Sequence, residues 1–366
     1  MSMGVKKLYK FLSELKLITE YPTLTKYVNT QLKTKNNKLI NPNNSIVVAI
    51  DFWLYAHKFT YSYGNMFVGF WNQIIKLLSH KIIPLYIYDG QTPIEKSAVI
   101  IGRQKKKIHM VNKLKDIYEE LTDIEYQNNN QHTEKLEHEK DRLEKSIIYI
   151  NSVDVENIKK LFDTINIPYL SAKGEADSLC AKLYKDGYIT SCLSDDMDML
   201  ALGCGKTIKF FEGKILEFDL QYILSKLALT YEQFVEMCLL FGCDYVKPHY
   251  NLHVNESYNL IKKYGSIPKI LSDSNHQHLN YTNEKCKNFI LGYNQAKFIL
   301  MTSSETETIP INFNPFIESD KEIDSFVILQ YFKIHGQLNF VDNNIDEILD
   351  RIEYINNLIS RKYFCN

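Results

Sequence analysis

The 366-residue chain lacks the features of a membrane or secreted protein. It has no run of about 18 apolar residues, which excludes an ordinary transmembrane helix. Its N-terminus carries lysines rather than an apolar stretch before a small-residue cleavage site, so we expect no signal peptide. With 45% hydrophobic residues, the chain can bury a large core. The composition therefore predicts a globular protein of one large domain or two modest ones.

Cysteine is sparse, and its spacing excludes two common uses. The seven cysteines are odd in number and never form a Cys-x-x-Cys pair. This pattern favours reduced thiols over a disulfide framework or a zinc site. We therefore expect an intracellular protein.

An excess of positive charge is also missing, since the net charge is −1. This argues against the uniformly basic surface of many nucleic-acid-binding proteins. One stretch is locally basic, and its cations are Lys96, Arg103, Lys105, Lys106, Lys107, Lys113 and Lys115. Composition alone leaves two interpretations open, a solvated helix face or a surface for an anionic partner.

Seven acidic residues stand where an apolar, strand-like run ends or a helix begins. They are Asp51, Asp89, Glu175, Asp177, Asp196, Asp198 and Asp244. An unpaired buried carboxylate costs several kcal/mol, and neighbouring carboxylates repel one another. Divalent metal ions relieve both penalties, because hard cations bind carboxylate oxygens. The pattern predicts a metal-dependent enzyme.

Apolar runs alternate with helical periodicity, which predicts an α/β fold with a mostly parallel sheet flanked by helices. The expected strands are 45–50, 83–88, 167–170, 188–193 and 207–211, and the expected helices between them are 66–80, 155–165 and 175–185. Ligands of such open sheets bind beyond the carboxyl ends of the strands. Asp51, Asp89 and Asp196 follow strands, so we expect them at one edge of the sheet.

The spacing within two acidic pairs adds detail. Asp196 and Asp198 are two positions apart, which in an extended segment would put both side chains on one side. Glu175 and Asp177 have the same spacing, but a regular helix would separate them. They can converge only if Gly174 and Glu175 form the start of the helix, where carboxylates are favoured.

Helical segments dominate the middle and the end of the chain. Residues 105–120 and 134–150 are charged and helix-favouring, and a polar hinge at 126–132 separates them. A surface hairpin without a role explains this composition as well as a functional one does. From Leu229 onward the chain is mostly helical, with an apolar helix at 231–241 and a polar connector at 304–315.

Several motifs resemble, in order, those of the flap endonucleases of the XPG superfamily. They are Met3-Gly4-Val5-Lys6-Lys7-Leu8, AIDFW around Asp51, LYIYDGQTP around Asp89, IPYLSAKGEADSLCAKL at 167–183, SDDMDMLALG at 194–203 and LLFGCDY at 239–245. The resemblance covers about residues 3–270. It implies a PIN-like nuclease core with a helical arch insertion and a C-terminal helical region. The implied regions are 1–95 (N-terminal nuclease), 96–152 (arch and gateway), 153–245 (internal nuclease, completing the same domain) and 246–366 (helical, with a degenerate helix-turn-helix motif that binds DNA).

The same resemblance implies an activity and a site. The activity would be a Mg²⁺-dependent 5′ flap endonuclease with 5′–3′ exonuclease activity, in which two Mg²⁺ ions, replaceable by Mn²⁺, hydrolyse DNA during replication, repair or recombination. The seven acids would hold the metals, Asp244 through water, and Lys96 and Arg103, seven apart on one helix face, would act on the phosphate. Expected DNA contacts are Gly4, Tyr55, His57, Lys105, Lys106, Lys107 and His253. The implied location is the nucleus or another site of DNA replication.

Three departures from the family pattern bear on these expectations. Asp177 replaces a usual glutamate, and His57 stands where the family stacks an aromatic ring, with Tyr55 and Phe59 nearby. Packed aromatics are an alternative explanation for the last two. The glycine-rich turn that grips duplex backbone reads Asn251-Leu252-His253-Val254-Asn255, so we expect a weaker or remodelled grip.

The resemblance leaves partners and close alternatives open. The expected partner is branched or 5′-flapped DNA, bound by a monomer without a membrane. Tyr363-Phe364 resemble the aromatic end of a sliding-clamp peptide only in part, and docking on the chain's own domain is the preferred interpretation. Alternative functions are an exonuclease-like or junction-resolving relative, a catalytically idle scaffold that binds branched DNA, and a ribonuclease.

Overall fold

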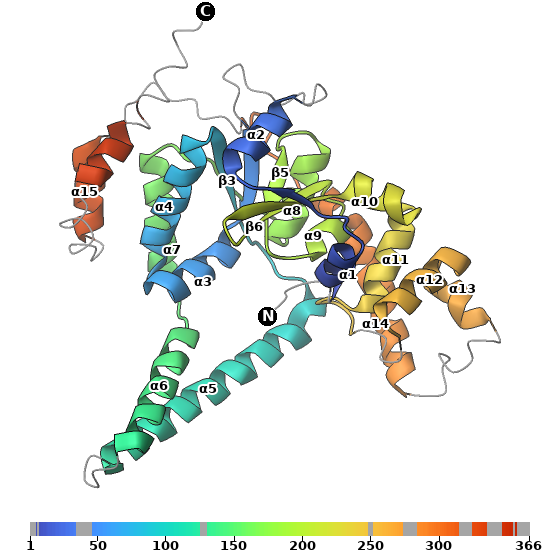
Figure 1. Ribbon diagram of the computed structural model, residues 1–366, viewed down its shortest axis with the longest axis horizontal. Helices are drawn as coiled ribbons and strands as arrows, with labels where there is room; N and C mark the ends of the chain where they lie inside the picture. Colours follow the sequence, from blue (N-terminus) through green and yellow to red (C-terminus); the bar gives the residue numbers. More distant parts are fainter. Residues whose placement is uncertain are drawn as a thin grey trace, which may run out of the picture.

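A seven-stranded mixed sheet forms the centre of the computed structural model (Figure 1). The structure describes residues 5, 7–33, 46–124, 130–247, 252–273, 284–314, 324–334, 346–353 and 356. The strands are β1 (Thr19–Tyr21), β2 (Ile46–Asp51), β3 (Ile82–Tyr88), β4 (Tyr169–Ser171), β5 (Ser191–Leu193), β6 (Lys206–Phe211) and β7 (Lys214–Asp219), in the order β1-β7-β6-β5-β2-β3-β4. Four adjacent pairs, from β6 to β4, are parallel, and β7 pairs antiparallel with β6 and β1. The predicted α/β class is confirmed.

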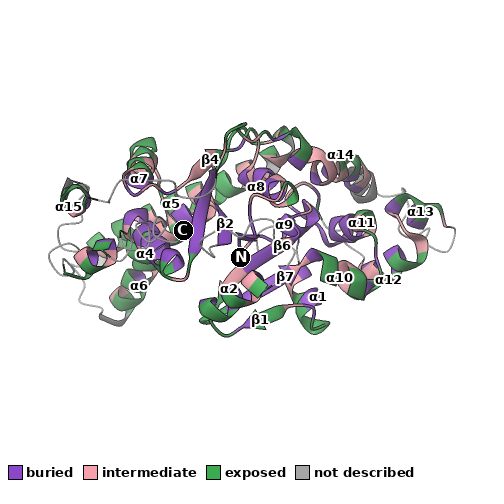
Figure 2. Cartoon of the chain, turned by 90° about the horizontal axis from the view of Figure 1, so that it is seen from above, coloured by how far each residue is buried: buried purple, intermediate pink, exposed green. Residues whose placement is uncertain are grey.

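Helices make up most of the rest of the described structure. They are α1 (Leu8–Glu14), α2 (Leu24–Lys33), α3 (Phe52–Tyr63), α4 (Met66–Ser79), α5 (Ser97–Ile124), α6 (Asn130–Ser146), α7 (Ser152–Thr164), α8 (Ala176–Lys185), α9 (Asp198–Ala201), α10 (Leu220–Leu227), α11 (Tyr231–Phe241), α12 (Val254–Tyr264), α13 (Ile267–Ser272), α14 (Glu284–Thr306) and α15 (Ser325–Ile334). Every residue of β3 is buried, and so are the first five of β2, which requires cover on both faces of the sheet (Figure 2). Aromatic rings fill much of the space beside β3, where Tyr86 stacks on Phe162 of α7 with 4.5 Å between ring centroids.

The predicted strands and helices are found with shifted ends. The 188–193 strand is reduced to Ser191–Leu193, because residues 187–188 close α8. Gly187 has φ 82°, and the Tyr188 N–H donates to the carbonyl of Leu183 at 2.8 Å. Helix α3 was not predicted, and neither were α1, α2, β1 and β7.

Helices α5 and α6 project from the body of the molecule as an antiparallel hairpin (Figure 1). The hairpin has a small core of its own, made by Ile117, Leu136 and Leu143. This arrangement confirms two helices in the predicted insertion, although α5 begins earlier than expected. Helix α6 already includes residues 130–132 of the predicted hinge, while 125–129 lie outside the described residues.

The chain after α10 is helical, as predicted, and a buried carboxylate organises it. Glu236 on α11 is fully buried and accepts hydrogen bonds from the Tyr293 hydroxyl (2.6 Å), the Lys297 ammonium (2.8 Å) and the Ile267 N–H (3.1 Å). These bonds join α11 to α14 and to the start of α13. The predicted connector 304–315 is partly helical, since α14 continues to Thr306.

Two absences concern the described residues only. None of their helices is long and apolar enough to cross a membrane. Cys180, Cys192, Cys204, Cys238 and Cys243 are buried and free, in agreement with the predicted reduced thiols.

Candidate functional site

The seven predicted acids come from separate parts of the chain and meet at the carboxyl ends of the parallel strands. Asp51 ends β2, Asp89 follows β3, and Asp196 follows β5. Glu175 and Asp177 lie at the start of α8, Asp198 begins α9, and Asp244 follows α11. Besides burial, the charges of Asp89 and Asp196 raise the pKa of Asp51, and those of Asp244 and Glu175 raise the pKa of Asp198, so these acids lie close together. We call these seven residues the acid cluster.

Two members of the acid cluster also hold local structure. The Asp51 carboxylate caps α3 by accepting from the N–H groups of Trp53 (2.8 Å) and Leu54 (3.2 Å). The Asp89 carboxylate accepts from the N–H of Ala176 (2.8 Å), the first residue of α8. Both acids thus use the free N–H groups at a helix start, where negative charge is stabilised.

Asp196 and Asp198 converge by a different route from the one predicted. The expected extended segment is wrong, since Met197 has φ −82° and ψ −7° and α9 begins at Asp198. The Asp198 N–H donates to the Asp196 carboxylate at 2.9 Å, and the Asp196 N–H donates to the Ser194 hydroxyl at 3.0 Å. A tight turn therefore brings the two carboxylates together, because short side chains here bond to nearby backbone.

At the start of α8, the prediction is confirmed. Glu175 is the N-cap residue, with extended backbone (φ −91°, ψ 146°), and Asp177 lies in the first turn. The change of backbone between them allows both side chains to reach the cluster, which a regular helix would prevent.

Burial leaves several of these carboxylates without compensation. One oxygen of Asp177 and both oxygens of Asp198 are buried and have no hydrogen-bond partner among the described residues. Burial, followed by repulsion from Asp196, raises the pKa of each of these two acids well above its usual value. Burial raises the pKa of Asp51 to about 7 and that of Asp196 to about 6. Uncompensated carboxylates of this kind favour the binding of a cation.

The donor set suits a hard divalent ion, because it consists of carboxylate oxygens only. In the present side-chain arrangement, no three Asp, Glu, His or Cys side chains of the described residues are grouped closely enough to hold a metal ion. Two basic side chains lie on cluster carboxylates instead. Metal binding would therefore require these side chains to rearrange.

Lys96 is the first of these cations. Its ammonium lies 2.6 Å from Glu175 and 4.9 Å from the centre of the Tyr245 ring, and the Tyr245 hydroxyl donates to the other Glu175 oxygen at 2.5 Å. Burial alone would lower the pKa of Lys96, but the negative charges of Glu175 and Asp177 raise it by more, so the net shift of the pKa is upward. Lys96 is therefore a permanent cation inside the acid cluster.

Arg103 is the second cation. Its guanidinium lies 2.9 Å from the Asp244 carboxylate, and its side chain remains 57% exposed. The expectation that Lys96 and Arg103 share one helix face is wrong in detail, since Lys96 ends a short 3-10 turn, Ile94–Lys96, and only Arg103 lies on α5. Pro93 is the residue that precedes this turn.

The predicted DNA contacts differ in their surroundings. Lys105, Lys106, His57 and His253 are exposed. Lys107 is half-buried, and its ammonium donates to the carbonyl of Ile148 (2.6 Å) and lies 3.6 Å from the centre of the Tyr149 ring.

The remaining predicted DNA contacts are either buried or outside the described residues. Tyr55 is only 3% exposed and packs against Phe59, which agrees with the packed-aromatic alternative and argues against stacking on DNA. Gly4, Asn251 and the Tyr363-Phe364 pair lie outside the described residues.

Sequence reasoning missed two residues at this site. Tyr245, which holds Glu175, directly follows Asp244 in the quoted LLFGCDY motif, and this adjacency was the available signal. Asp195, the remaining acid of SDDMD, pairs with Lys58 at 3.0 Å and Lys209 at 3.4 Å. It anchors the turn from outside the acid cluster.

Comparisons with known proteins find similarity in the part of the chain that contains most of the acid cluster. The XPG I-region family matches residues 166–244, which include five of the seven acids. Flap endonuclease 1 of Dictyostelium discoideum is 31% identical over 209 residues, covering 56% of this chain and 51% of the relative. Flap endonuclease 1 of Saccharomyces cerevisiae is 28% identical over 269 residues, covering 71% of this chain and 65% of the relative.

The fold is also found among solved structures. The catalytic core of Rad2 in complex with DNA substrate has a TM-score of 0.64 at 18% identity, covering 95% of this chain and 100% of that one. At this identity the likeness concerns the fold alone. The chain spans between half and two thirds of the length of the two flap endonucleases just described.

Proposed function

Since the chain is related to the flap endonucleases of the XPG superfamily, as its motifs predicted, we propose that it is a structure-specific 5′ nuclease acting on DNA. One observation carries the proposal. Seven carboxylates meet at one sheet edge, three of their oxygens are buried without a partner among the described residues, and Lys96 and Arg103 lie against them. Such a cluster is costly for folding, which is typical of groups kept for chemistry.

The acid cluster would hold two Mg²⁺ ions. Asp177 and Asp198 are the strongest candidates for direct ligands, because their buried oxygens lack partners within the described chain. Asp51, Asp89, Glu175, Asp196 and Asp244 would complete the site directly or through water. Bound Mg²⁺ would supply an activated water and neutralise charge at the scissile phosphate, and Mn²⁺ would substitute.

Lys96 and Arg103 would change partners when substrate binds. Both cations now pair with cluster carboxylates, Glu175 and Asp244. Once the carboxylates are neutralised, the ammonium and the guanidinium are free to contact a phosphate. Cations placed where charge develops in the transition state accelerate the reaction more than they strengthen binding.

The α5–α6 hairpin would guide the single strand toward this site. Its first helix leads away from Arg103, and Lys105 and Lys106 are exposed on it. Exposed cations position the phosphate backbone without reading sequence. His57 and His253 are exposed candidates for further contacts, on α3 and before α12.

Within this class of nucleases, we infer a 5′ flap endonuclease with 5′–3′ exonuclease activity. It would act in replication, repair or recombination, in the nucleus or at another site of DNA synthesis. An exonuclease-like or junction-resolving preference is the alternative within the same chemistry. An idle scaffold is disfavoured, because all seven acids are retained. A sliding clamp would bind through the Tyr363-Phe364 pair, which matches a clamp peptide only in part.

A panel of labelled substrates tests the proposal. The chain is given a 5′ flap, a gapped duplex, a blunt duplex, a four-way junction and an RNA strand, each with Mg²⁺ and with EDTA. We expect Mg²⁺-dependent release of the flap as the fastest reaction. Faster cleavage of the junction or of the blunt end would favour the alternatives, and binding of branched DNA without cleavage would overturn the nuclease assignment.

A further inference from the structure

Glu307, immediately after α14, holds the backbone that leads into α8. Its two carboxylate oxygens accept hydrogen bonds from the N–H groups of Lys173 and Gly174, each at 2.8 Å, although the pairs are 134 and 133 positions apart in sequence. Only 3% of Glu307 is exposed. Hydrogen bonds to a buried ionised carboxylate are stronger than those between neutral groups. The residues just before Glu175 are thus fixed by the C-terminal part of the chain.

The backbone after Asp89 holds the same loop from the other side. The N–H of Gly90 donates to the carbonyl of Gly174 at 2.7 Å, and the N–H of Gln91 donates to the carbonyl of Lys173 at 2.8 Å. A Cβ on Gly90 would lie 2.2 Å from the carbonyl oxygen of Ala172, so this close approach requires glycine. Residues 172–174 are therefore clamped between the 90–91 backbone and the Glu307 side chain.

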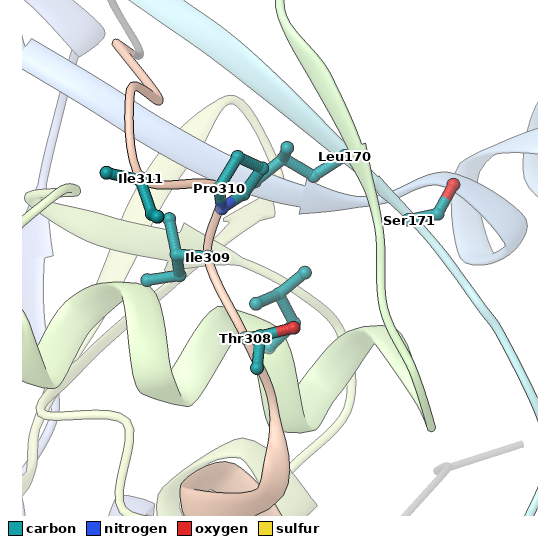
Figure 3. A pocket seen from close by; sticks show the side chains of 7 residues that line it. Leu170, Ser171, Thr308, Ile309, Pro310 and Ile311 are labelled. Atoms are coloured by element: carbon teal, nitrogen blue, oxygen red, sulfur yellow. The ribbon is translucent and has the colours of Figure 1, made fainter.

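The segment after Glu307 is itself anchored beside the sheet. Residues 308–311 run along β4, and Figure 3 shows them next to Leu170 and Ser171. Together with Leu179 of α8, they line a cavity of about 340 Å³. On α14, the Ser304 hydroxyl accepts from the Lys185 ammonium at the far end of α8, at 2.8 Å. The chain on either side of Glu307 thus packs against β4 and α8, the strand and the helix that flank the clamped loop.

We propose that Glu307 is a positioning residue for metal binding by the acid cluster. The inference rests on the proposed function, because it concerns the same ions. Glu175 directly follows the clamped loop, Asp177 lies in the first turn of α8, and Asp89 accepts from the Ala176 N–H. A shift of this loop would move all three carboxylates. Glu307 itself would contact neither metal nor DNA.

The test measures Mn²⁺ binding by the full chain without DNA, using electron paramagnetic resonance of free Mn²⁺. Glu307→Gln keeps the shape but turns an amide NH2 group toward one of the two N–H donors, so one of the two hydrogen bonds that hold the loop is lost. We expect Mn²⁺ affinity to fall about tenfold or more, the usual effect of removing a group that orients metal ligands. Hydrogen exchange at the amides of Lys173 and Gly174 should become faster in this variant.

Ser304→Ala is the matched control. It removes a hydrogen bond between α14 and α8 but leaves the clamped loop intact, so Mn²⁺ affinity should stay at the wild-type value. Equal weakening in both variants would reduce Glu307 to general support of α14 and overturn the inference. Unchanged Mn²⁺ affinity in Glu307→Gln would overturn it as well. If Glu307→Gln does not fold, Glu307→Asp, whose carboxylate is too short to reach both N–H groups, takes its place under the same criteria.

Flap cleavage by the wild type, measured in parallel, separates this inference from the proposed function. Mn²⁺ binding without any cleavage would refute the nuclease and leave the positioning role standing. Cleavage by the wild type together with unchanged binding in Glu307→Gln would refute the positioning role alone. No Mn²⁺ binding by the wild type would refute both.

Discussion

The sheet edge and the α5–α6 hairpin differ in how their charges are held. At the sheet edge, acids are buried among strands and helix starts, and two of them have unpaired oxygens within the described chain. On the hairpin, most charged side chains face solvent. A small cluster around Ile117, Leu136 and Leu143 and surface pairs such as Lys113–Glu139 hold the helices together. Rigid, costly burial thus occurs where chemistry is proposed, and an extended polar surface occurs where a strand would be guided.

The largest effect should come from breaking the acid cluster itself. Asp198→Asn keeps the volume but removes a buried negative charge, so we expect cleavage to fall at least about a thousandfold under single-turnover conditions. Flap binding should persist, because DNA affinity comes mainly from phosphate contacts elsewhere. Without metal, the variant should be as stable as the wild type or more so, since it no longer buries an uncompensated charge. Wild-type turnover would contradict the role assigned to Asp198.

Arg103 tests the boundary between the two regions, because it lies on α5 but pairs with Asp244. Arg103→Ala should slow the single-turnover rate about a hundredfold while weakening flap affinity only a few-fold. Lys106→Ala, on the exposed part of the same helix, is the control and should change affinity and its salt dependence alone. If both variants affect only affinity, Arg103 is an ordinary phosphate contact.

The pH dependence of stability should distinguish the sheet edge from the rest. The pKa of Asp51 rises from 3.8 to about 7 on folding, mainly through burial, so between these values the folded state binds more protons than the unfolded state. In EDTA, the stability that Asp51 contributes is therefore fully present below about pH 4 and is lost as the pH rises toward 7. One pKa unit corresponds to about 1.4 kcal/mol, and the shift is about three units, so the loss should be on the order of 4 kcal/mol.

Urea denaturation at several pH values with and without Mg²⁺ measures this loss. Mg²⁺ should reduce it, because a bound cation stabilises the ionised form. Asp51→Asn should flatten the pH profile in EDTA. A profile that is identical in the wild type and in Asp51→Asn would show that Asp51 does not carry the effect.

The smallest effect on global stability should come from the hairpin core. Leu136→Ala removes one of three buried side chains there, and the hairpin should open locally while the melting temperature of the sheet stays nearly unchanged. Hydrogen exchange should become faster along α5 and α6 but not in β2 and β3. A cooperative loss of protection in both regions would mean that the hairpin and the sheet unfold as one unit.

The sequence revealed the parts that depend on local patterns. The apolar runs before Asp51 and Asp89 predicted β2 and β3, and aspartates at strand ends predicted one shared edge. Helix α3 was missed because its sequence, FWLYAHKFTYSY, is rich in aromatic residues that favour strands, while the cap that starts it comes from Asp51.

Long-range contacts escaped prediction for a different reason. No local pattern links Glu307 to Lys173 or Lys96 to Glu175, because these pairs meet only after the sheet has formed. The turn at Asp196 and Asp198 was read as extended, since a spacing of two fits a strand as well as a turn stabilised by side-chain bonds. Roles as metal ligands and DNA contacts stay predictions.

Helix α5 joins the two regions mechanically. Its 28 residues form a rod about 42 Å long. Arg103 and Lys107 lie four positions apart on one side of α5. The Lys107 ammonium joins α5 to Ile148 and Tyr149, which directly follow α6. A displacement of the hairpin tip would therefore tilt both helices about the Lys107 contact and move the nearby Arg103 guanidinium relative to Asp244.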